Sequence, residues 1–257
     1  MKKKRVLITG MSGLIGGIMR RALEGTYELV ALNRRDIPGV RSYQADISDL
    51  EAIRPAFEGV DVVLHLAANA NANASLDDVV HHNITGTCNV FEAARAAGVR
   101  RIVSASSGSV IRYHERDEPY RTLVEGPDKR EPPSWPMITH RSPFRPDGLY
   151  GCSKVWGEAL ARYFSDEYDM SIICVRIGAV VPGDQPNQPR LFSAWCSHRD
   201  VAQMLEKCIA APHELRFDIF YAVSNNRRNY RDLDHSRNVL GYEPKDNADT
   251  FAARQSQ

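Results

Sequence analysis

The alternation of two kinds of segment constrains the fold of this chain more than any other feature of its sequence. Short apolar runs rich in β-branched residues take turns with longer segments of helical periodicity, which is the pattern of βαβ units and a parallel sheet. Strands are predicted at 5–9, 28–33, 40–44, 60–66, 101–106 and 171–177. Helices are predicted near 14–23, 50–57, 76–97 and 149–165, with Asp49 as an N-cap and Gly98 as a C-terminal glycine. The fold class that follows is α/β with a doubly wound parallel sheet.

At 257 residues the chain is long enough to bury a full core and fits one α/β domain better than two. Its 33 Lys and Arg residues nearly balance 32 Asp and Glu residues, which argues against nucleic acid or an anionic membrane as a partner. The basic start at 1–5 precedes an apolar stretch too short for a signal peptide, and no run is long enough to span a membrane. The cysteines form no C-x-x-C pair, which suits a reducing cytoplasm.

A glycine-rich turn, containing Gly10, Gly13 and Gly16, leaves the first predicted strand and opens the first predicted helix. Such a turn lets backbone N–H groups and the positive end of the helix dipole meet a pyrophosphate. Glycine also serves plain tight turns, and the motif alone does not separate the two. In a parallel sheet of this kind it predicts a Rossmann-type dinucleotide site.

Tyr150 and Lys154 stand four residues apart in the predicted helix 149–165, so they project from one face. The ammonium group near the phenol would favour the phenolate and lower the tyrosine pKa from its usual value of about 10. An ordinary helix face has the same spacing, so the pair gains meaning only together with the glycine turn. One motif offers a place for a dinucleotide and the other a phenol that moves a proton, which indicates a redox site.

Residues 108–148 interrupt the alternation, because half of the 14 prolines lie between Pro119 and Pro146. Proline fixes φ and lacks an N–H, so neither a regular helix nor a central strand is expected here. The segment is either a lid over the substrate, which its place just before Tyr150 favours, or a mobile insertion. Beyond it, helices near 200–211 and 231–240 and a strand at 219–223 are predicted. One Rossmann-type domain, 1–257, would then comprise a cofactor-binding core, 1–180, and a small substrate-binding cap, 181–257.

The Gly-x-x-Gly-x-x-Gly turn and the Tyr-x-x-x-Lys pair together resemble the extended branch of the short-chain dehydrogenase/reductase superfamily, the NAD-dependent epimerases and dehydratases. The resemblance implies that Tyr150 moves the proton of the reacting oxygen and that Lys154 lowers the tyrosine pKa and holds the nicotinamide ribose. It implies that Ser107 hydrogen-bonds the reacting oxygen, with Ser106 as the nearest competitor. The cofactor-binding residues that it implies are Gly10, Gly13, Leu14, Ile15, Gly16, Asn33, Arg34, Arg35, Asp46, Ile47, Leu66, Ala67, Ala68, Asn83, Tyr150, Lys154 and Ile177.

The choice of cofactor depends on Asn33, Arg34 and Arg35 at the end of the second predicted strand. Members that use NAD generally have an acidic residue there for the ribose 2′-hydroxyl, and it is missing here. Two guanidinium groups are able to clamp a 2′-phosphate, so NADP is expected in preference to NAD. The alternatives are that both arginines are solvated loop charges, or that Asp36 bends back to the ribose.

Within the superfamily the chain resembles the uronate dehydrogenase group, which oxidises an aldose at C1 to a lactone. The resemblance runs through 145–154, 157–158, 175–178, 190–195, 240–244 and 246–248. It implies a substrate site of Asn71, Ser107, Gly108, Ser109, Ala179 and Arg190, in which Arg190 binds the sugar carboxylate. The alternative for Arg190 is a surface salt bridge.

Three pocket positions depart from that group. Where its members usually have Asn-His and a serine, this chain has Gly108-Ser109 and Ala179, and the segment 108–148 is longer than theirs. The expected substrate is therefore an acidic aldose, which is a uronate or a phosphorylated or sulfonated hexose.

Two other functions stay open. A nucleotide-sugar dehydratase would place acids after the catalytic serine, and an epimerase would need a larger C-terminal domain. A non-catalytic dinucleotide-sensing regulator characteristically lacks the Tyr-x-x-x-Lys pair. No metal is expected, since no two histidines are four residues apart and adjacent His81 and His82 would point in different directions on a helix. Superfamily habit implies a homodimer or higher homo-oligomer through the helices 76–97 and 149–165.

Overall fold

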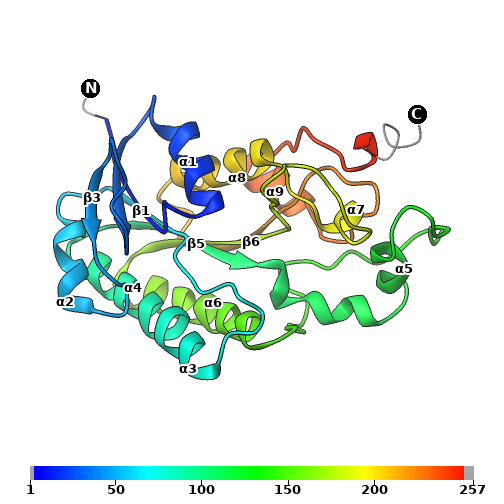
Figure 1. The fold of residues 1–257 in the computed structure, drawn as a ribbon, viewed down its shortest axis with the longest axis horizontal. Coiled ribbons are helices and arrows are strands. Elements are labelled where there is room, and N and C mark those ends of the chain that lie inside the picture. The colour runs from blue at the N-terminus through cyan, green and yellow to red at the C-terminus, as the bar shows by residue number, and fades with distance from the viewer. Residues whose placement is uncertain (1–2, 252–257) are drawn as a thin grey trace.

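The computed structural model describes residues 3–251, which fold around one sheet of seven strands (Figure 1). All neighbouring strands are parallel, in the order β3-β2-β1-β4-β5-β6-β7. The predicted α/β class and doubly wound parallel sheet are confirmed. The strands are β1 (Arg5–Thr9), β2 (Glu28–Asn33), β3 (Arg41–Gln44), β4 (Val62–His65), β5 (Arg101–Ser107), β6 (Ser171–Ile177) and β7 (Phe217–Ala222).

The strand order creates a switch point between β1 and β4. The chain moves outward from β1 through β2 to β3, and then returns to β4 on the other side of β1. The loops that leave the carboxyl ends of β1 and β4 diverge there, and open α/β sheets bind ligands in such a crevice. The side chains of β4 and β6 are buried throughout, because helices cover both faces of the sheet.

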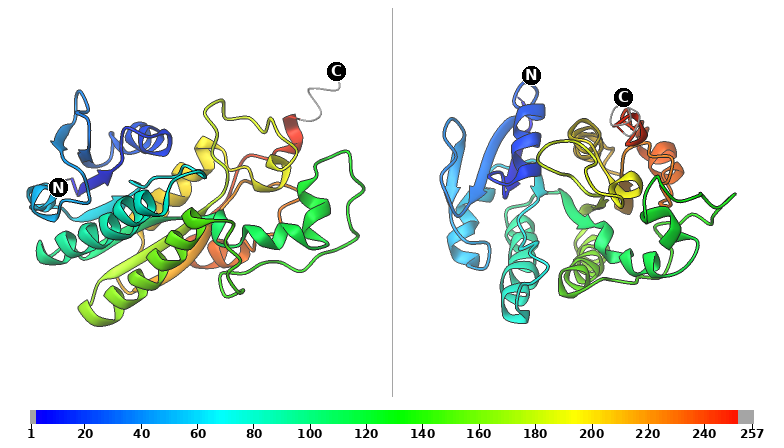
Figure 2. Two further views of the ribbon diagram at one scale, coloured as in Figure 1. Left: turned by 60° about the horizontal axis from the view of Figure 1, so that its bottom comes forward. Right: turned by 45° about the vertical axis from the view of Figure 1, so that its right-hand side comes forward.

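Helices form a layer on each side of the sheet (Figures 1 and 2). One face carries α1 (Leu14–Leu23) and α8 (His198–Ala210), and the other carries α2 (Leu50–Ile53), α4 (Gly86–Ala96) and α6 (Leu149–Tyr168). Both predicted helix-end residues are confirmed. The Asp49 side chain caps α2 by accepting from the backbone N–H of Ala52, and Gly98 follows α4 with a φ of +73°.

The predicted helix 76–97 is interrupted near its start. α3 (Leu76–Val79) continues into a π-helical segment, Val80–Thr85, before α4 begins. Such segments lie frequently at functional sites. This one carries His82, which lines the cavity at the switch point, and the buried Asn83.

Residues 108–148, called the lid segment from here on, contain one short α-helix, α5 (Tyr120–Val124), and 3-10 turns at Gly108–Val110 and Arg112–Arg116. The expectation that no regular helix forms in this segment is therefore wrong for α5. Pro119 stands at the N-cap of α5, where a missing N–H breaks no helical hydrogen bond.

The lid segment lies beside the C-terminal part of the chain (Figure 2). The backbone N–H of Ile138 donates to the Tyr230 carbonyl, and the carbonyl of Ile138 accepts from the N–H of Asp232. The Trp135 indole N–H donates to the Asn229 carbonyl at 3.0 Å. These bonds attach the lid segment to the loop that follows β7.

The chain after β6 contributes to the helix–sheet sandwich as well as to its edge. β7 extends the sheet beside β6, and α8 packs on the same side as α1. Two short helices belong to the same part of the chain: α7 (Leu191–Ala194) lies near α5 of the lid segment (Figure 1), and α9 (Asp234–Leu240) packs against β7. None of the helices within residues 3–251 is long and apolar enough to cross a membrane.

Candidate active site

A cavity of about 390 Å³, called the cofactor cavity from here on, opens at the switch point between β1 and β4. Most of the predicted cofactor-binding residues line it, but Leu14, Ile15, Gly16, Asn83, Tyr150, Lys154 and Ile177 do not. The full lining is Gly10, Ser12, Gly13, Leu32, Asn33, Arg34, Arg35, Ala45, Asp46, Ile47, Leu66, Ala67, Ala68, Asn69, Ala70 and His82.

Two glycines of the first turn are required by its geometry. Gly10 has a φ of +72°, and a Cβ atom there would lie 2.9 Å from the backbone of Ala67. A Cβ atom at Gly16 would lie 2.4 Å from the carbonyl oxygen of Gly10, so α1 packs on the turn only because residue 16 has no side chain. Gly13 is the N-cap of α1 and contributes no capping side chain, which leaves the first N–H groups of the helix to a ligand.

Asn33, at the end of β2, is buried and only half satisfied. Its Oδ1 accepts a hydrogen bond from the backbone N–H of Ser12 at 3.1 Å, whereas its Nδ2 has no partner among residues 3–251. A buried unpaired donor is costly, and in a cavity wall a ligand can satisfy it. Arg34 and Arg35 follow with exposed side chains and line the same cavity. The glycine turn and this donor fit a bound dinucleotide.

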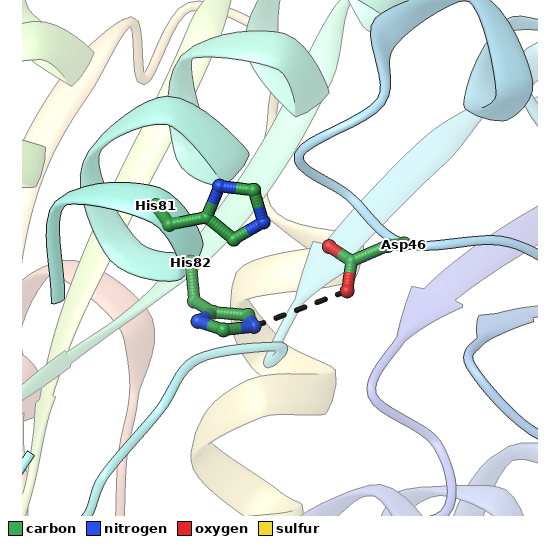
Figure 3. A group of neighbouring side chains, drawn as sticks. All are labelled: Asp46, His81 and His82. Carbon is green, nitrogen blue, oxygen red and sulfur yellow. Dashed lines mark ion pairs between the residues drawn. The ribbon is translucent and has the colours of Figure 1, made fainter. Parts of the chain in front are cut away.

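Asp46, His81 and His82 form a polar group at the cofactor cavity (Figure 3). Asp46 Oδ1 accepts from the N–H and the hydroxyl of Ser48 at 2.9 and 2.8 Å, and its Oδ2 lies 3.9 Å from His82 Nε2. Partial burial raises the pKa of Asp46, but the Ser48 hydrogen bonds and the neighbouring side chains of His82 and Arg34 hold it below its ordinary value.

The expectation that His81 and His82 point in different directions is wrong. The rings of His81 and His82 meet edge to face with centroids 4.8 Å apart, so they do not point in different directions. The reason is the π-helical segment, whose wider turn rotates successive side chains less than an α-helical turn does.

His65, at the end of β4, holds the carboxyl ends of β1 and β4 together. The Thr9 hydroxyl accepts from the backbone N–H groups of Leu66 and Ala67 at 3.2 and 3.1 Å, so its own hydrogen points to His65 Nδ1 at 2.8 Å. His65 Nε2 then carries the proton and donates to the Thr87 hydroxyl at 3.1 Å. This network fixes the backbone of Leu66 and Ala67, which line the cofactor cavity.

The predicted catalytic residues Ser107, Tyr150 and Lys154 lie together where β5 ends and α6 begins. The Ser107 hydroxyl accepts from the backbone N–H of Ser109 at 3.1 Å and lies close enough to the Tyr150 hydroxyl to lower its pKa. Lys154 Nζ donates to the Ala105 carbonyl at 2.8 Å and lies 5.6 Å from the centre of the Tyr150 ring.

The acidities of this group differ from the expectation. Burial raises the pKa of Tyr150, and the hydrogen bond to Ser107 offsets only part of that rise, so the lowering expected from Lys154 is not found. Burial also lowers the pKa of Lys154 to about 8, against the opposing influence of Cys174 and Glu158. Lys154 is therefore still mostly protonated at neutral pH.

Ser106, the competitor of Ser107, belongs to a different network. Its hydroxyl donates to Glu158 Oε1 at 2.6 Å, and both carboxylate oxygens of Glu158 also accept from Arg176, each at 2.8 Å. Glu158 and Arg176 are buried side chains of α6 and β6. Ser106 is thus bound to a buried ion pair, whereas Ser107 faces Tyr150.

Asn83 joins the loop after β4 to α6. Its Oδ1 accepts from the backbone N–H of Asn69 at 2.7 Å, and its Nδ2 donates to the Asn69 carbonyl at 3.0 Å and the Ser153 hydroxyl at 3.1 Å. Since Ser153 precedes Lys154, these bonds hold the first turn of α6 against that loop. Asn83 therefore supports the loop and the helix, and it does not line the cofactor cavity.

A second cavity, of about 160 Å³ and called the substrate cavity from here on, lies beside Ser107. Four further residues of the predicted substrate site line it, namely Gly108, Ser109, Ala179 and Arg190. Asn71 does not, because it lies in the exposed loop 66–75, where its side chain accepts from the Asn73 N–H. Ile177, predicted to touch the cofactor, also borders this cavity. The full lining is Ser107, Gly108, Ser109, Arg112, Ile177, Gly178, Ala179, Arg190, Ala194 and Arg231.

Arg190 forms a two-pronged ion pair inside the protein. Its Nε and Nη2 both lie 2.7 Å from the Glu115 carboxylate, which comes from the lid segment. Burial raises the pKa of Glu115, but Arg190, Arg231 and the Tyr230 hydroxyl together hold it below its ordinary value. Arg190 thus forms the salt bridge that the alternative expected, but with a largely buried partner and at the wall of the substrate cavity, so binding of the sugar carboxylate by Arg190 stays a prediction.

Sequence reasoning missed three charged residues at the substrate cavity: Arg112 and Arg231, which line it, and Glu115, which pairs with Arg190. Each lies on a short turn or a loop, where no periodicity marks a side chain as facing inward. Arg112 and Glu115, predicted as part of a lid, carried an indirect signal.

Two groups of side chains could each offer ligand atoms to a metal within residues 3–251, Asp46–His81–His82 and His140–Asp218–His235, and sequence spacing revealed neither. In the second group the rings of His140 and His235 are stacked, 4.0 Å apart and 21° from parallel. Their nitrogen lone pairs lie in the ring planes and therefore point side by side instead of toward one ion.

Comparison with known proteins shows relatives over nearly the whole chain. The chain is 34% identical to a protein named NAD-dependent glucose-6-phosphate dehydrogenase from Haloferax volcanii, covering 96% of this chain and 95% of that protein. It is 33% identical to a uronate dehydrogenase from Pseudomonas putida, with coverages of 97% and 87%. It is 32% identical to an L-arabinose 1-dehydrogenase (NAD(P)(+)) from Haloferax volcanii, with coverages of 96% and 98%.

Solved structures agree with these relatives. The crystal structure of uronate dehydrogenase from Agrobacterium tumefaciens matches with a TM-score of 0.82 and 33% identity, over 99% of this chain and 89% of that one. A point mutant of that enzyme complexed with NAD matches with a TM-score of 0.81 and 32% identity, over 98% and 88%. The model of the NAD dependent epimerase/dehydratase family matches residues 6–207. The chain therefore belongs to the NAD dependent epimerase/dehydratase family.

Proposed function

We propose that this protein is an NAD(P)-dependent sugar dehydrogenase that oxidises an acidic aldose at C1 to a lactone. The observation that carries the proposal is that Ser107 and Arg190 line one small cavity. A hydroxyl that binds the reacting oxygen and a guanidinium that binds an anion thus face the same ligand. The relatives support it, since two of the three are named for an anionic sugar.

The chemistry divides between the chain and its cofactor. Bound NAD(P) supplies the acceptor for the hydride that leaves C1. Tyr150 takes the proton of the C1 hydroxyl, and Ser107 donates a hydrogen bond to the oxygen as its charge develops. Lys154 is anchored on the Ala105 carbonyl beside the Tyr150 ring, where it would hold the nicotinamide ribose of the bound cofactor.

The size of the substrate cavity bears on the alternative of a nucleotide-sugar epimerase or dehydratase. A volume of about 160 Å³ lies below the ~300–1,000 Å³ usual for drug-sized ligands, so it suits a single sugar better than a nucleotide-sugar. Gly108 and Ser109 add no acid next to Ser107. Both observations favour a dehydrogenase acting on a free sugar.

NADP is the cofactor that we propose this enzyme prefers. No carboxylate follows Asn33 directly, and the exposed guanidinium groups of Arg34 and Arg35 line the cofactor cavity. An arginine fork matches a 2′-phosphate, whereas an acidic residue at this place would repel it.

The test of the proposed function is Arg190→Ala, assayed on an acidic aldose and on its neutral parent sugar. Losing the charge-assisted bonds of the guanidinium should cost about 1.5–3 kcal/mol for the acidic sugar, or roughly 10- to 150-fold in kcat/KM. Activity on the neutral sugar should change less than about threefold. Steady-state rates of reduced nicotinamide formation measure both.

Arg190→Lys is the matched control, because it keeps the charge facing Glu115 but loses the fork. It should fall between the wild type and Arg190→Ala on the acidic sugar. Equal losses of kcat/KM on the acidic and neutral sugars would mean that Arg190 supports the cavity wall and does not bind the anionic group of the substrate. A wild type that prefers the neutral sugar would remove the basis for an acidic substrate.

A further inference from the structure

A second guanidinium group faces the substrate cavity, on a residue that the sequence pattern did not single out. Arg231 belongs to the loop between β7 and α9 and lines the cavity with Arg190. Its side chain is 1% exposed, so the charge is almost fully removed from water. Burying a charged group is costly unless partners compensate, and the partners of Arg231 are incomplete.

The hydrogen bonds of Arg231 leave one donor free. Nη2 donates to the Tyr230 hydroxyl at 2.9 Å and reaches Glu115 Oε1 at 3.4 Å, and Nη1 donates to the Ser193 carbonyl at 3.4 Å. Nε is buried and has no partner within the described residues 3–251. The unpaired donor belongs to a guanidinium that lines a cavity, where a ligand atom can satisfy it.

The free Nε faces the space over Gly108. A Cβ atom built on Gly108 would lie 3.9 Å from it and 3.6 Å from the carbonyl oxygen of Ile177. Gly108 follows Ser107 directly and lines the same cavity. Because residue 108 has no side chain, nothing from that position separates Nε, which is shielded from solvent, from a ligand beside Ser107.

The charges around the cavity do not balance without a ligand anion. Arg112 is paired with Asp147 at 2.7 Å. Glu115 serves both Arg190 and Arg231 and also lies 3.7 Å from Arg112, so three guanidinium groups surround two carboxylates. An anionic ligand supplies the missing negative charge.

We propose that Arg231 is a second anion-binding residue. Together with Arg190 it selects a sugar that bears a tetrahedral anionic group, either a phosphate or a sulfonate. The inference rests on the proposed function and names its substrate class. Glu115 occupies Nε and Nη2 of Arg190, which leaves Nη1 for the ligand. A planar carboxylate is satisfied by one fork, whereas the three terminal oxygens of a tetrahedral group accept from donors in different planes.

The test compares four sugars that share a ring: glucose 6-phosphate, 6-deoxy-6-sulfoglucose, glucuronate and glucose. The wild type should prefer at least one of the two tetrahedral anions to glucuronate. Arg231→Met, which keeps the apolar stem, should lower kcat/KM for that anion by about 10- to 150-fold, the range of one hydrogen bond to a charged group. Glucose should change less than about threefold. The two tetrahedral anions distinguish a phosphate ester from a sulfonate.

Arg228→Met is the matched control, because Arg228 is an equally buried arginine of the same loop that lies outside the substrate cavity. It donates to carbonyls of the lid segment, such as that of Lys129. Its replacement should leave the ratio between anionic and neutral sugars unchanged. A ratio that falls as far in Arg228→Met as in Arg231→Met would overturn the proposal.

Gly108→Ala tests the same idea with the charge of Arg231 intact. The added methyl group meets its neighbours at ordinary contact distances, so the melting temperature should stay unchanged while the preference for the tetrahedral anion falls. A wild type that oxidises glucuronate best, through Arg190, would sink this inference and leave the proposed function standing. Failure of all three acidic sugars to outperform glucose would sink both.

Discussion

Two neighbouring serines at the end of β5 have different partners at different places along α6. The Ser106 hydroxyl donates a hydrogen bond to Glu158, and Ser107 lies beside Tyr150, near the start of the helix. A shift of one residue would therefore exchange a structural hydroxyl for a reactive one. Which of the two serines meets Tyr150 therefore depends on their positions along β5, since both are the same residue type.

For Tyr150→Phe we expect turnover to fall by at least about 100-fold, since general acid–base groups typically contribute 10²–10⁴-fold. The substitution removes the hydroxyl that bonds to Ser107 and keeps the ring beside Lys154. Quenching of protein fluorescence should show unchanged cofactor binding. A variant within about tenfold of the wild-type rate would contradict the proton-transfer role.

For Arg34→Asp we expect the cofactor preference to reverse from NADP to NAD. Each charge-assisted bond to a 2′-phosphate is worth about 1.5–3 kcal/mol, and a carboxylate there would repel the phosphate. The ratio of kcat/KM values for the two cofactors measures the effect, with Arg21→Asp on α1 as a control of equal charge outside the cofactor cavity. A wild-type enzyme that already prefers NAD would show that Arg34 does not bind the 2′-phosphate of NADP.

At the scale of elements, α6 is fixed to the sheet by a buried ion pair. Arg176 on β6 donates two hydrogen bonds to Glu158 on α6, and its third nitrogen donates to the Tyr221 hydroxyl on β7 at 3.0 Å. Burial lowers the pKa of Arg176, but these partners raise it above its ordinary value. The pair sets how α6, which carries Tyr150 and Lys154, lies on β5 and β6.

We expect Glu158→Gln to lower the free energy of unfolding by about 3–5 kcal/mol, because it leaves the Arg176 charge buried without its counter-ion. The double variant Glu158→Gln with Arg176→Met should recover a large part of that loss. Urea unfolding curves of the three proteins give the comparison. A double variant that is less stable than Glu158→Gln would show that the arginine stabilises the fold without its partner.

At the scale of the whole molecule, stability depends on pH through His65. Burial and, to a lesser extent, the charge of Lys154 lower the pKa of His65 to about 3, from an ordinary value near 6.5. Below pH 6.5, His65 therefore binds a proton in the unfolded chain, whereas it stays neutral in the folded protein until the pH approaches 3. Stability is fully present above that pH and is lost as the pH falls from 6.5 toward 3.

We expect acidification from pH 6.5 to 4.5 to remove about 2–3 kcal/mol of stability through this residue, at ~1.4 kcal/mol per pH unit. His65→Gln removes the titration. The stability difference between wild type and variant, measured by urea unfolding at both pH values, should shrink by that amount. A difference that is independent of pH would mean that His65 is not the titrating group.

The assembly of the molecule stays a prediction. A homodimer through α3, α4 and α6 was expected from superfamily habit, and exposed apolar side chains on these helices, Leu76, Leu149 and Tyr163, are consistent with it. The assignment of the lid segment and the C-terminal residues to substrate binding also stays a prediction, which the Arg190 and Arg231 variants address.

The sequence by itself determined the sheet and the positions of its motifs, because these follow from local chemistry. Periodicity marked β1, β2 and β6 at their observed bounds, and the glycine turn is forced by a φ of +72° at Gly10 and by the contact of Gly16 with Gly10. Tyr150 and Lys154 could be paired because their spacing along the chain survives folding unchanged, whereas Ser107 was named from the family resemblance.

Only the tertiary structure decided which charged residues of the site pair with one another. Glu115 precedes Arg190 by 75 residues and Arg231 by 116 residues along the chain. No local pattern reports that two guanidinium groups so far away share one buried carboxylate. The raised pKa of Tyr150 was missed for the same reason, since burial acts on it only once packing has removed the water.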